Sequence, residues 1–323
     1  MILEIIDDFA RLLDFQAEWS AFAQSTPGIT PFQLPDWLIT WWRHFGSGRL
    51  HVLVFRENEN LTGVVPCFLH QWNGLRQMTL IGSGISDYLD PLIAPQHAAT
   101  LIERLRIHLE GNSDWDICNW QDLSLQTPLK AIASEIIEET PCSEIPLTGT
   151  FDQYWSARSK SLRQNVRRDR LKAEVQGALH FEVRRALDPE TMSALIELHA
   201  ARWRRHGESG MIEENHSAAF IEEVAQEFAA RDRLRIFVLH FRTRIAAVLL
   251  GFGYDRTVFN YLTAFDPETE TLGLGRTLLF EAIRDSFWRG CRAWNFLRGS
   301  EPYKTWWGAK EIPKCRVIVR RTA

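Results

Sequence analysis

The sequence predicts an α/β (α+β) protein of two related halves, each a mixed, mostly antiparallel sheet flanked by helices. Two similar hairpin patterns indicate the halves: LHVLVFRENENLTGVVP (Leu50–Pro66) and LRIFVLHFRTRIAAVLL (Leu234–Leu250) begin 184 residues apart. Each is an apolar strand, a polar turn and a second apolar strand, and a tryptophan-containing helix pattern precedes each. We therefore predict domains at residues 1–150 and 151–323, with convergence of two unrelated hairpins as the alternative.

The elements of the second half follow from its caps and breakers. Residues 151–177 predict a long basic helix that ends at Gly177, and ALHFEVRRA predicts a strand. Asp188 is the expected N-cap of the next helix, with Pro189 in its first turn, and AAFIEEVAQEFAARD predicts another helix. Further elements are expected in this order: strands at about 234–241, 244–253 and 256–264, a glycine loop, a helix to about 289, the strand CRAWNFL, the short helix in EPYKTWWGAK and the strand CRVIVRR.

This order predicts where a binding site would lie. Three antiparallel strands followed by a helix that returns to a neighbouring strand imply one parallel pair in the sheet. A crevice opens where two parallel strands diverge, and the N-terminus of the returning helix points into it. The segment TLGLGRTLLFEAI (271–283) has two glycines directly before that helix, so its backbone N–H groups could bind an anion. A simple turn that contains two glycines is the alternative.

Composition excludes several classes of protein. The chain of 323 residues is 45% hydrophobic and 24% charged, as in soluble globular proteins, and it has no long apolar run. The acidic start MILEIIDDFA does not fit a signal peptide, so we predict a cytoplasmic protein and leave peripheral attachment to a membrane open. The five cysteines form no C-x-x-C pair, so neither a disulfide framework nor a metal site is expected.

Charge is distributed unevenly along the chain. Residues 1–150 carry a net charge of -11, whereas residues 151–323 carry +7. A cationic half suggests an anionic ligand, although the two halves could simply attract one another. Residues 158–172 alone have seven Lys or Arg and one acid. Such a helix could contact nucleic acid or a membrane, but we interpret it as a solvated or inter-domain face and predict no nucleic-acid partner.

The motif and the order of elements resemble those of a known superfamily. The order with L-G-L-G-R at the loop resembles the GCN5-related N-acetyltransferase (GNAT) fold, whose [Q/R]-x-x-G-x-[G/A] loop binds acyl-CoA. Gly273 and Gly275 match this motif, whereas Glu270 stands where Gln or Arg is usual. A closer resemblance, over nearly the whole chain, is to the CelD-like acetyltransferases associated with cellulose and exopolysaccharide biosynthesis, distant relatives of the Fem-type aminoacyl transferases. It is carried by PDWLITWW, GISDYLDPL, SKSLRQNVRRDR, LHAARW, FDPETETLGLGRTLLFEAI and NFLRGSEPYKTWWG.

The resemblance implies two GNAT-like halves, of which only residues 151–323 carry an acyl-CoA site. Acetyl-CoA or another acyl-CoA is the implied co-substrate, and no metal is implied. Its pyrophosphate would lie on the backbone and helix dipole at the loop. The implied cofactor-binding residues are Leu272, Gly273, Leu274, Gly275, Arg276 and Thr277.

Acyl transfer needs a deprotonated nucleophile, a stabilised carbonyl oxygen and a stabilised leaving thiolate. In GNAT-like sites a backbone N–H of the strand before the loop is often the oxyanion donor, so the resemblance implies the N–H groups at about residues 262–265. Tyr303 resembles the tyrosine that GNAT enzymes place near the thiolate, and packing beside Trp306 and Trp307 is its alternative role. Glu301 is the candidate base, although it could equally serve as an acid at a helix N-terminus.

Four residues are candidates for binding the acceptor. Asp87 and Tyr88, in SDYLD, suit recognition of a hydroxyl or amine, and a capped turn is the alternative. Trp203 could stack on a sugar, or it could belong to the core. Lys304 could bind a phosphate or carboxylate, or it could be solvated.

Three functions follow as hypotheses. The first is an acyl-CoA-dependent N- or O-acyltransferase that acts on a small molecule or a saccharide, in peripheral association with polysaccharide-synthesis machinery. The second is a Fem-type transferase that takes its acyl group from aminoacyl-tRNA. The third is a non-catalytic GNAT-like module of polysaccharide biosynthesis, a hypothesis that Glu270 encourages because an acid near a pyrophosphate is unfavourable.

Overall fold

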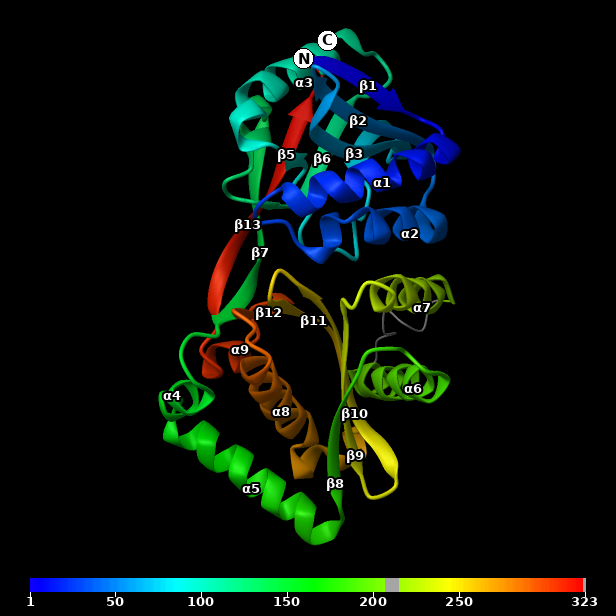
Figure 1. The fold of residues 1–323 in the computed structure, drawn as a ribbon. Coiled ribbons are helices and arrows are strands. Elements are labelled where there is room, and N and C mark those ends of the chain that lie inside the picture. Colours follow the sequence, from blue (N-terminus) through cyan, green and yellow to red (C-terminus); the bar gives the residue numbers. More distant parts are fainter. Residues whose placement is uncertain (207–214, 322–323) are drawn as a thin grey trace. The chain divides into compact units, whose positions relative to one another are not determined.

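The computed structural model describes residues 1–206 and 215–321, without side chains at 202, 203, 205, 206 and 215 (Figure 1). The chain divides into two compact units. Unit 1 consists of Met1–Pro141 and Pro313–Ala323, and unit 2 of Cys142–Ile312. The predicted division at residue 150 assigns the last strand to the second domain, whereas most of that strand is part of unit 1.

Unit 1 is a mixed sheet with flanking helices. Its strand order is β1-β2-β3-β4-β6-β13, and the neighbours are antiparallel except for β4 and β6. The short strand β5 pairs with β3. The elements are β1 (Ile2–Ile6), α1 (Phe9–Ser25), η1 (Pro31–Gln33), α2 (Pro35–Phe45), β2 (Arg49–Glu57), β3 (Asn60–Trp72), β4 (Leu75–Leu80), β5 (Leu92–Ile93), η2 (Pro95–His97), α3 (Ala98–Gly111), β6 (Ile117–Ser124), η3 (Pro128–Ile132) and β7 (Glu135–Pro146), which continues into unit 2.

Unit 2 is built in the same way, with strand order β7-β12-β11-β10-β9-β8. Only β11 and β12 are parallel among these neighbours. Figure 1 shows α6 and α7 on one face of this sheet, and α8 with α5 on the other. The elements are α4 (Phe151–Ser156), α5 (Lys160–Gln176), β8 (Leu179–Arg184), α6 (Pro189–His206), α7 (Asn215–Ala229), β9 (Leu234–Phe241), β10 (Arg244–Tyr254), β11 (Thr257–Phe265), η5 (Pro267–Leu272), α8 (Leu274–Trp288), β12 (Ala293–Arg298), α9 (Pro302–Trp306) and β13 (Lys310–Arg320).

The two units share one order of elements. In each unit a strand is followed by two helices, three antiparallel strands, a further helix and a strand that pairs in parallel with the third of the three. The order is β1-α1-α2-β2-β3-β4-α3-β6 in unit 1 and β8-α6-α7-β9-β10-β11-α8-β12 in unit 2. The predicted mixed, mostly antiparallel sheets flanked by helices are therefore confirmed. The strand that follows each set in the sequence pairs with a strand of the other set. Strand β7 follows β6 but pairs with β12, and β13 follows β12 but pairs with β6. This pairing explains why the end of the chain is part of unit 1.

The long helix predicted for residues 151–177 is wrong, because it consists of two helices. Thr150 caps α4 by accepting from the Gln153 N–H, and the Gln153 side chain accepts in return from the Thr150 N–H. Ser159 then caps α5 by accepting from the Leu162 N–H. Ser and Thr side chains compete for the backbone in this way, so each begins a helix of its own. The predicted end at Gly177 is confirmed.

Packing of α5 against α8 fixes the start of α8. The buried residues of α5 recur at helical spacing and are Leu162, Val166, Asp169 and Ala173. Apolar side chains of α8, among them Leu278 and Ala282, complete the same core with strands β9 and β10. Burying each such leucine or valine stabilises the fold by roughly 1.5–3 kcal/mol. Because α5 carries an acid in this apolar stripe, a carboxylate lies buried beside α8.

The helices of the described residues include none that is both long enough and apolar enough to cross a membrane.

Candidate active site

The predicted crevice forms where β11 and β12 separate. The two strands pair in parallel only from Thr257–Phe259 with Ala293–Asn295, and β11 then continues to Phe265. Beyond Phe259, the edge of β11 that faces β12 has no ladder partner among the described strands. The N–H groups expected as oxyanion donors, at about residues 262–265, belong to this part of β11, and that role stays a prediction.

A β-bulge in β11 lies next to Asn260, which lines the candidate site. Leu250 pairs with Leu262 and Gly251 with Asn260, so Tyr261 is the extra residue. Gly251 allows this close approach, because a Cβ there would lie 2.6 Å from the Phe259 carbonyl oxygen. Asn260, the residue before the bulge, is the first residue of β11 after the parallel pairing, where the two strands separate.

The loop before α8 ends in a left-handed residue. Gly273 has φ 62° and is the N-cap of α8, and it offers no side-chain acceptor. The first N–H groups of a helix lack intrahelical acceptors. The Thr277 N–H makes the first bond of the helix, to the Gly273 carbonyl oxygen, which also accepts from the Thr277 hydroxyl. The N–H groups of residues 274–276 therefore point outward at the positive end of the helix dipole.

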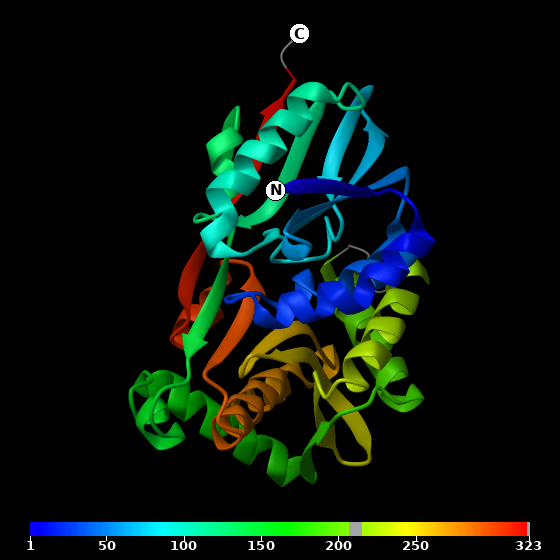
Figure 2. The same cartoon turned by 45° about the horizontal axis from the view of Figure 1, so that its top comes forward.

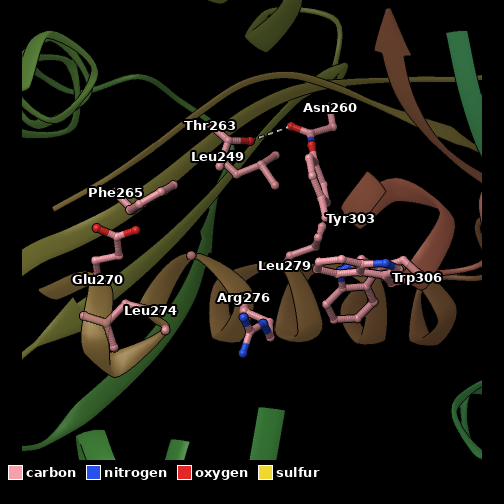
Figure 3. A pocket seen from close by; sticks show the side chains of 13 residues that line it. Leu249, Asn260, Thr263, Phe265, Glu270, Leu274, Arg276, Leu279, Tyr303 and Trp306 are labelled. Carbon is pink, nitrogen blue, oxygen red and sulfur yellow. Dashed lines mark hydrogen bonds between the residues drawn. The ribbon is translucent and has the colours of Figure 1, made fainter. Parts of the chain in front are cut away.

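A cavity of about 320 Å³ lies beside this helix start (Figure 3). Its apolar wall includes Leu249, Phe265 and Leu279, and its lining residues are Leu249, Asn260, Thr263, Phe265, Glu270, Gly273, Leu274, Gly275, Arg276, Leu279, Tyr303, Trp306 and Trp307. Of the six residues predicted to bind the cofactor, the lining includes Gly273, Leu274, Gly275 and Arg276. Leu272 and Thr277 are buried beside it and hold the loop.

Tyr303 enters this cavity from α9. Figure 3 shows its hydroxyl end pointing toward the side chain of Asn260, whose Oδ1 accepts a hydrogen bond from Thr263 Oγ1 at 3.0 Å. The Tyr303 ring packs edge-on against Phe296, with ring centres 5.8 Å apart. Tyr154 supports the end of α9, since its hydroxyl donates to the Trp307 carbonyl oxygen at 2.7 Å. The phenol is thus held at the point where β11 and β12 separate.

Two other predicted residues support α9 from outside the cavity. Lys304 is 3% exposed, and its ammonium donates to the carbonyl oxygens of Arg298 at 2.7 Å and Gly299 at 3.1 Å. Glu301 pairs with Lys304 at 2.9 Å and does not line the cavity. Lys304 therefore fastens the loop between β12 and α9, which differs from the predicted contact with substrate. A catalytic role for Glu301 stays a prediction that requires a relay through water.

The candidate acceptor residues of the first half lie inside unit 1. Asp87 and Tyr88 are buried, and the Lys314 ammonium lies 4.1 Å from the centre of the Tyr88 ring. Such burial favours a structural role over the predicted contact with an acceptor. The side chain of Trp203 lies outside the described residues.

A buried acid lies at the start of α8. Asp169 of α5 is 4% exposed and forms an ion pair with Arg276, so the charge of the predicted cofactor-binding arginine is balanced. A Cβ on Gly273 would collide with the Asp169 carboxylate. Lys172, one turn further along α5, donates to the Thr271 carbonyl oxygen at 2.9 Å. Helix α5 therefore holds the loop that begins α8.

Sequence reasoning missed Asn260, Thr263 and Asp169. Asn260 and Thr263 interrupt the apolar strand TVFNYLTAF, and polar residues in a buried strand are a signal that could have been followed. Asp169 is the single acid among the cations of residues 158–172, but nothing in the sequence shows that it points inward.

Comparison with known proteins concerns the fold. Residues 160–305 match the family model of the acetyltransferase (GNAT) domain. The fold is a GNAT fold. A search of curated proteins found no match.

Solved structures resemble nearly the whole chain. The crystal structure of FemX aligns over 98% of this chain and 97% of its own, with 10% identity and a TM-score of 0.69. The C-terminal domain (DUF2156) of a putative lysylphosphatidylglycerol synthetase from Agrobacterium fabrum aligns over 94% and 92%, with 12% identity and a TM-score of 0.60. A GNAT-family acetyltransferase from Colwellia psychrerythraea aligns over 99% and 100%, with 10% identity and a TM-score of 0.53. At these identities the likeness concerns the fold alone.

GNAT domains typically use acyl-CoA, and the residues at the start of α8 fit its diphosphate. Three outward N–H groups and a helix dipole would face the anion. A Cβ on Gly275 would lie 3.0 Å from the Phe265 ring, so a larger side chain there would fill the gap beside the loop. Among the described residues, no group of three His, Cys, Asp or Glu side chains could hold a metal ion.

Proposed function

We propose that unit 2 transfers an acyl group, preferably acetyl, from acyl-CoA to an amine or hydroxyl by direct attack in a ternary complex. One observation carries this proposal: the N-terminus of α8, the separation of β11 from β12 and the hydroxyl of Tyr303 meet at one cavity of about 320 Å³. An acyl-thioester that lies along the unpaired edge of β11 would have its diphosphate at Gly273–Arg276.

The side chains of the cavity have separate roles in this proposal. Backbone N–H groups of β11 beyond Phe259 donate to the carbonyl oxygen as it becomes anionic. The nucleophile attacks the carbonyl carbon, and the C–S bond breaks as the tetrahedral intermediate collapses. Tyr303 donates a hydrogen bond to the departing sulfur, while Asn260 orients the phenol. The proton of the nucleophile leaves through water, with Glu301 as the proposed acceptor.

The acceptor is proposed as a saccharide or a polysaccharide precursor. The resemblance of SKSLRQNVRRDR and NFLRGSEPYKTWWG to CelD-like sequences supports this choice, as does the exposed Trp306 at the cavity. An indole face suits the apolar face of a sugar ring. Peripheral association with polysaccharide-synthesis machinery is part of the same proposal.

Calorimetry with acetyl-CoA tests the cofactor, and Gly275 offers a matched pair of variants. Gly275→Ala adds one methyl group 3.0 Å from Phe265 and should leave the affinity within about threefold of the parent. Gly275→Trp fills the gap and removes two or more charge-assisted hydrogen bonds, so the affinity should fall at least about a hundredfold. Equal affinity in parent and Gly275→Trp would show that the loop does not hold the ligand.

A Fem-type transferase that uses aminoacyl-tRNA is the second candidate. It is favoured by the acids at the helix start: Asp169 balances Arg276, and Glu270 lines the cavity where a GNAT loop usually has Gln or Arg. Glu270 opposes a diphosphate and suits the ammonium of an aminoacyl group, while Asp169 reduces the net positive charge at the helix start. The fold likeness to FemX is compatible with this candidate. Binding of charged tRNA without any binding of acetyl-CoA would support it over the first proposal.

A non-catalytic GNAT-like module is the third candidate, and Glu270 is again the feature that favours it. The titrations already described distinguish it, since such a module would bind neither acetyl-CoA nor charged tRNA.

A further inference from the structure

Helix α5 presents a cationic surface that the proposed acyl transfer does not use. The exposed positions of α5 are 160, 161, 163, 164, 167, 168, 171, 172 and 174–176, and most of them lie on one face of the helix. The acid on this face, Glu174, pairs with Arg170 at 2.8 Å. We call the following residues the α5 surface: Lys160, Arg163, Arg167, Arg168, Leu171, Lys172 and Val175.

The cations of the α5 surface are largely uncompensated. Lys160, Arg163 and Arg167 have no acidic partner within ion-pair distance among the described residues. Arg168 pairs with the buried Asp169 at 3.2 Å, and Lys172 donates only to a carbonyl oxygen. Five positive charges along a helix of 17 residues, about 25 Å long, therefore face solvent together.

Two aliphatic side chains lie among these cations. Leu171 is 51% exposed and Val175 is 87% exposed, on the same face as Arg167, Arg168 and Lys172. Arg242 extends the positive charge at the C-terminal end of α5, where its Nε donates to the Gln176 carbonyl oxygen. A helix with aliphatic side chains between cations fits the interface of an anionic bilayer, where the head groups meet the charges and the acyl chains meet the aliphatic groups.

The same face offers little to RNA. Proteins that bind single-stranded nucleic acid stack bases on aromatic rings beside a cationic groove. The α5 surface contains no aromatic residue, and Leu171 and Val175 would gain nothing from a phosphate backbone.

We propose that the α5 surface docks unit 2 on an anionic membrane surface. Figures 1 and 2 show α5 at the outside of unit 2, on the far side of α8 from the sheet. Asp169 and Lys172 connect α5 to the loop that begins α8, so docking brings the cavity-bearing unit close to lipid head groups. The proposal is independent of the acyl donor.

Vesicle flotation with the full chain tests this docking. The protein should bind vesicles of phosphatidylcholine with phosphatidylglycerol, and it should bind pure phosphatidylcholine vesicles at least about tenfold more weakly. Raising the salt concentration should weaken the binding, because exposed charges are screened. Equal binding to both kinds of vesicle would overturn the proposal.

A charge variant with a matched control locates the surface. Arg163→Gln together with Arg167→Gln keeps helix propensity and should lower the partition coefficient roughly thirtyfold, about fivefold for each arginine. Arg104→Gln with Arg106→Gln removes the same charge from α3 in unit 1 and should change the partition coefficient less than about twofold. An equal loss in both variants would mean that net charge, and not the α5 surface, drives binding.

An aliphatic variant separates lipid from RNA. Leu171→Ser with Val175→Ser should weaken binding to the anionic vesicles about tenfold, because less apolar surface is buried. Circular dichroism and thermal unfolding check that each variant remains folded. Bulk tRNA that binds more tightly than the vesicles, with no effect of the serine substitutions on either, would overturn the membrane proposal in favour of RNA.

Discussion

Replacing Tyr303 by phenylalanine should lower turnover about 10- to 160-fold and leave the affinity for acetyl-CoA unchanged. The change removes only the hydroxyl that points toward Asn260 in Figure 3. The ring keeps its edge-on contact with Phe296 at 5.8 Å, so stability should change by less than about 0.5 kcal/mol. A hydrogen bond to a charged group contributes roughly 1.5–3 kcal/mol, and each 1.36 kcal/mol is about a tenfold change in rate.

The assay follows release of free thiol from acetyl-CoA at saturating concentration, with pooled amines and sugars as acceptors. Because the hydrogen bond to sulfur forms as the thiolate leaves, kcat should fall while the dissociation constant for acetyl-CoA stays within about twofold. Single-turnover measurements confirm that the affected step is chemistry and not product release.

Tyr154→Phe is the matched control. Its hydroxyl also donates a hydrogen bond, to the Trp307 carbonyl oxygen at 2.7 Å, but Tyr154 does not line the cavity. Burial raises the pKa of Tyr154, so it remains a donor throughout the neutral range. This variant should lose about 1 kcal/mol of stability and change turnover less than about threefold. If Tyr303→Phe turns over as fast as the parent, or if both variants slow equally, Tyr303 has no role at the leaving sulfur.

The remaining predictions concern the bulge, the buried acid and a histidine pair. Gly251→Ala should cost about 1–3 kcal/mol of stability, measured by urea denaturation, because its Cβ would lie 2.6 Å from a carbonyl oxygen of β11; an unchanged midpoint would contradict this. Asp169→Asn removes the charge that balances Arg276, so acetyl-CoA should bind about fivefold more tightly in calorimetry, and weaker binding would refute the electrostatic argument. Burial first, and then the charges of His108 and a nearby arginine, lower the pKa of His51 to about 4. The unfolded chain therefore takes up a proton between about pH 6.5 and 4 that the folded chain does not, and the free energy of unfolding should fall by up to about 3 kcal/mol over that range, less so in His51→Gln.

The sequence was sufficient to predict most elements of unit 2. Apolar runs between polar turns predicted β9, β10 and β11, and the helix that returns the chain predicted the parallel pairing of β11 with β12. The pairing of β13 with β6 could not be predicted, because strand partners so far apart in the chain are chosen by tertiary packing. The break between α4 and α5 could have been predicted, since Thr150 and Ser159 are both capping residues, but no glycine or proline lies between them to mark the end of α4.

Some residues of the candidate site could likewise be predicted from the sequence, and others could not. The glycines of the loop were identified because a left-handed N-cap and a close approach of the backbone to a ligand both favour glycine. Gly273 indeed has φ 62°. Lys304 could be assigned a role only from coordinates, because a lysine that donates to backbone carbonyls and one that faces solvent look alike in a sequence. Asn260 lies at the crevice because the parallel pairing ends at Phe259, and a single sequence does not show where such a pairing ends.

The shared topology of the units raises the question of why only unit 2 would be catalytic. In unit 1 the strands β4 and β6 also part after a short parallel pairing, at Thr79 and Asn119. There the chain itself takes the place of a ligand: the Leu89 N–H donates to the Asp122 carbonyl oxygen at 3.0 Å, and the Asp90 carboxylate accepts from the Ser124 N–H at 2.9 Å. The edge of β6 is thereby satisfied by the SDYLD segment.

Between β11 and α8, a segment that the structure describes in full, there is no equivalent insert, because β11 leads through η5 directly into Gly273 and α8. Helix α3 of unit 1, in contrast, begins after His97 without a glycine, so even an open crevice there would lack the close backbone approach that a diphosphate needs. The duplicated fold thus contains two places where parallel strands diverge. In unit 1 that place is filled by the chain itself. In unit 2 it opens into a cavity that is lined by the start of α8 and by the phenol of Tyr303. We therefore propose that the SDYLD segment stabilises unit 1 and that the substrate binds to unit 2.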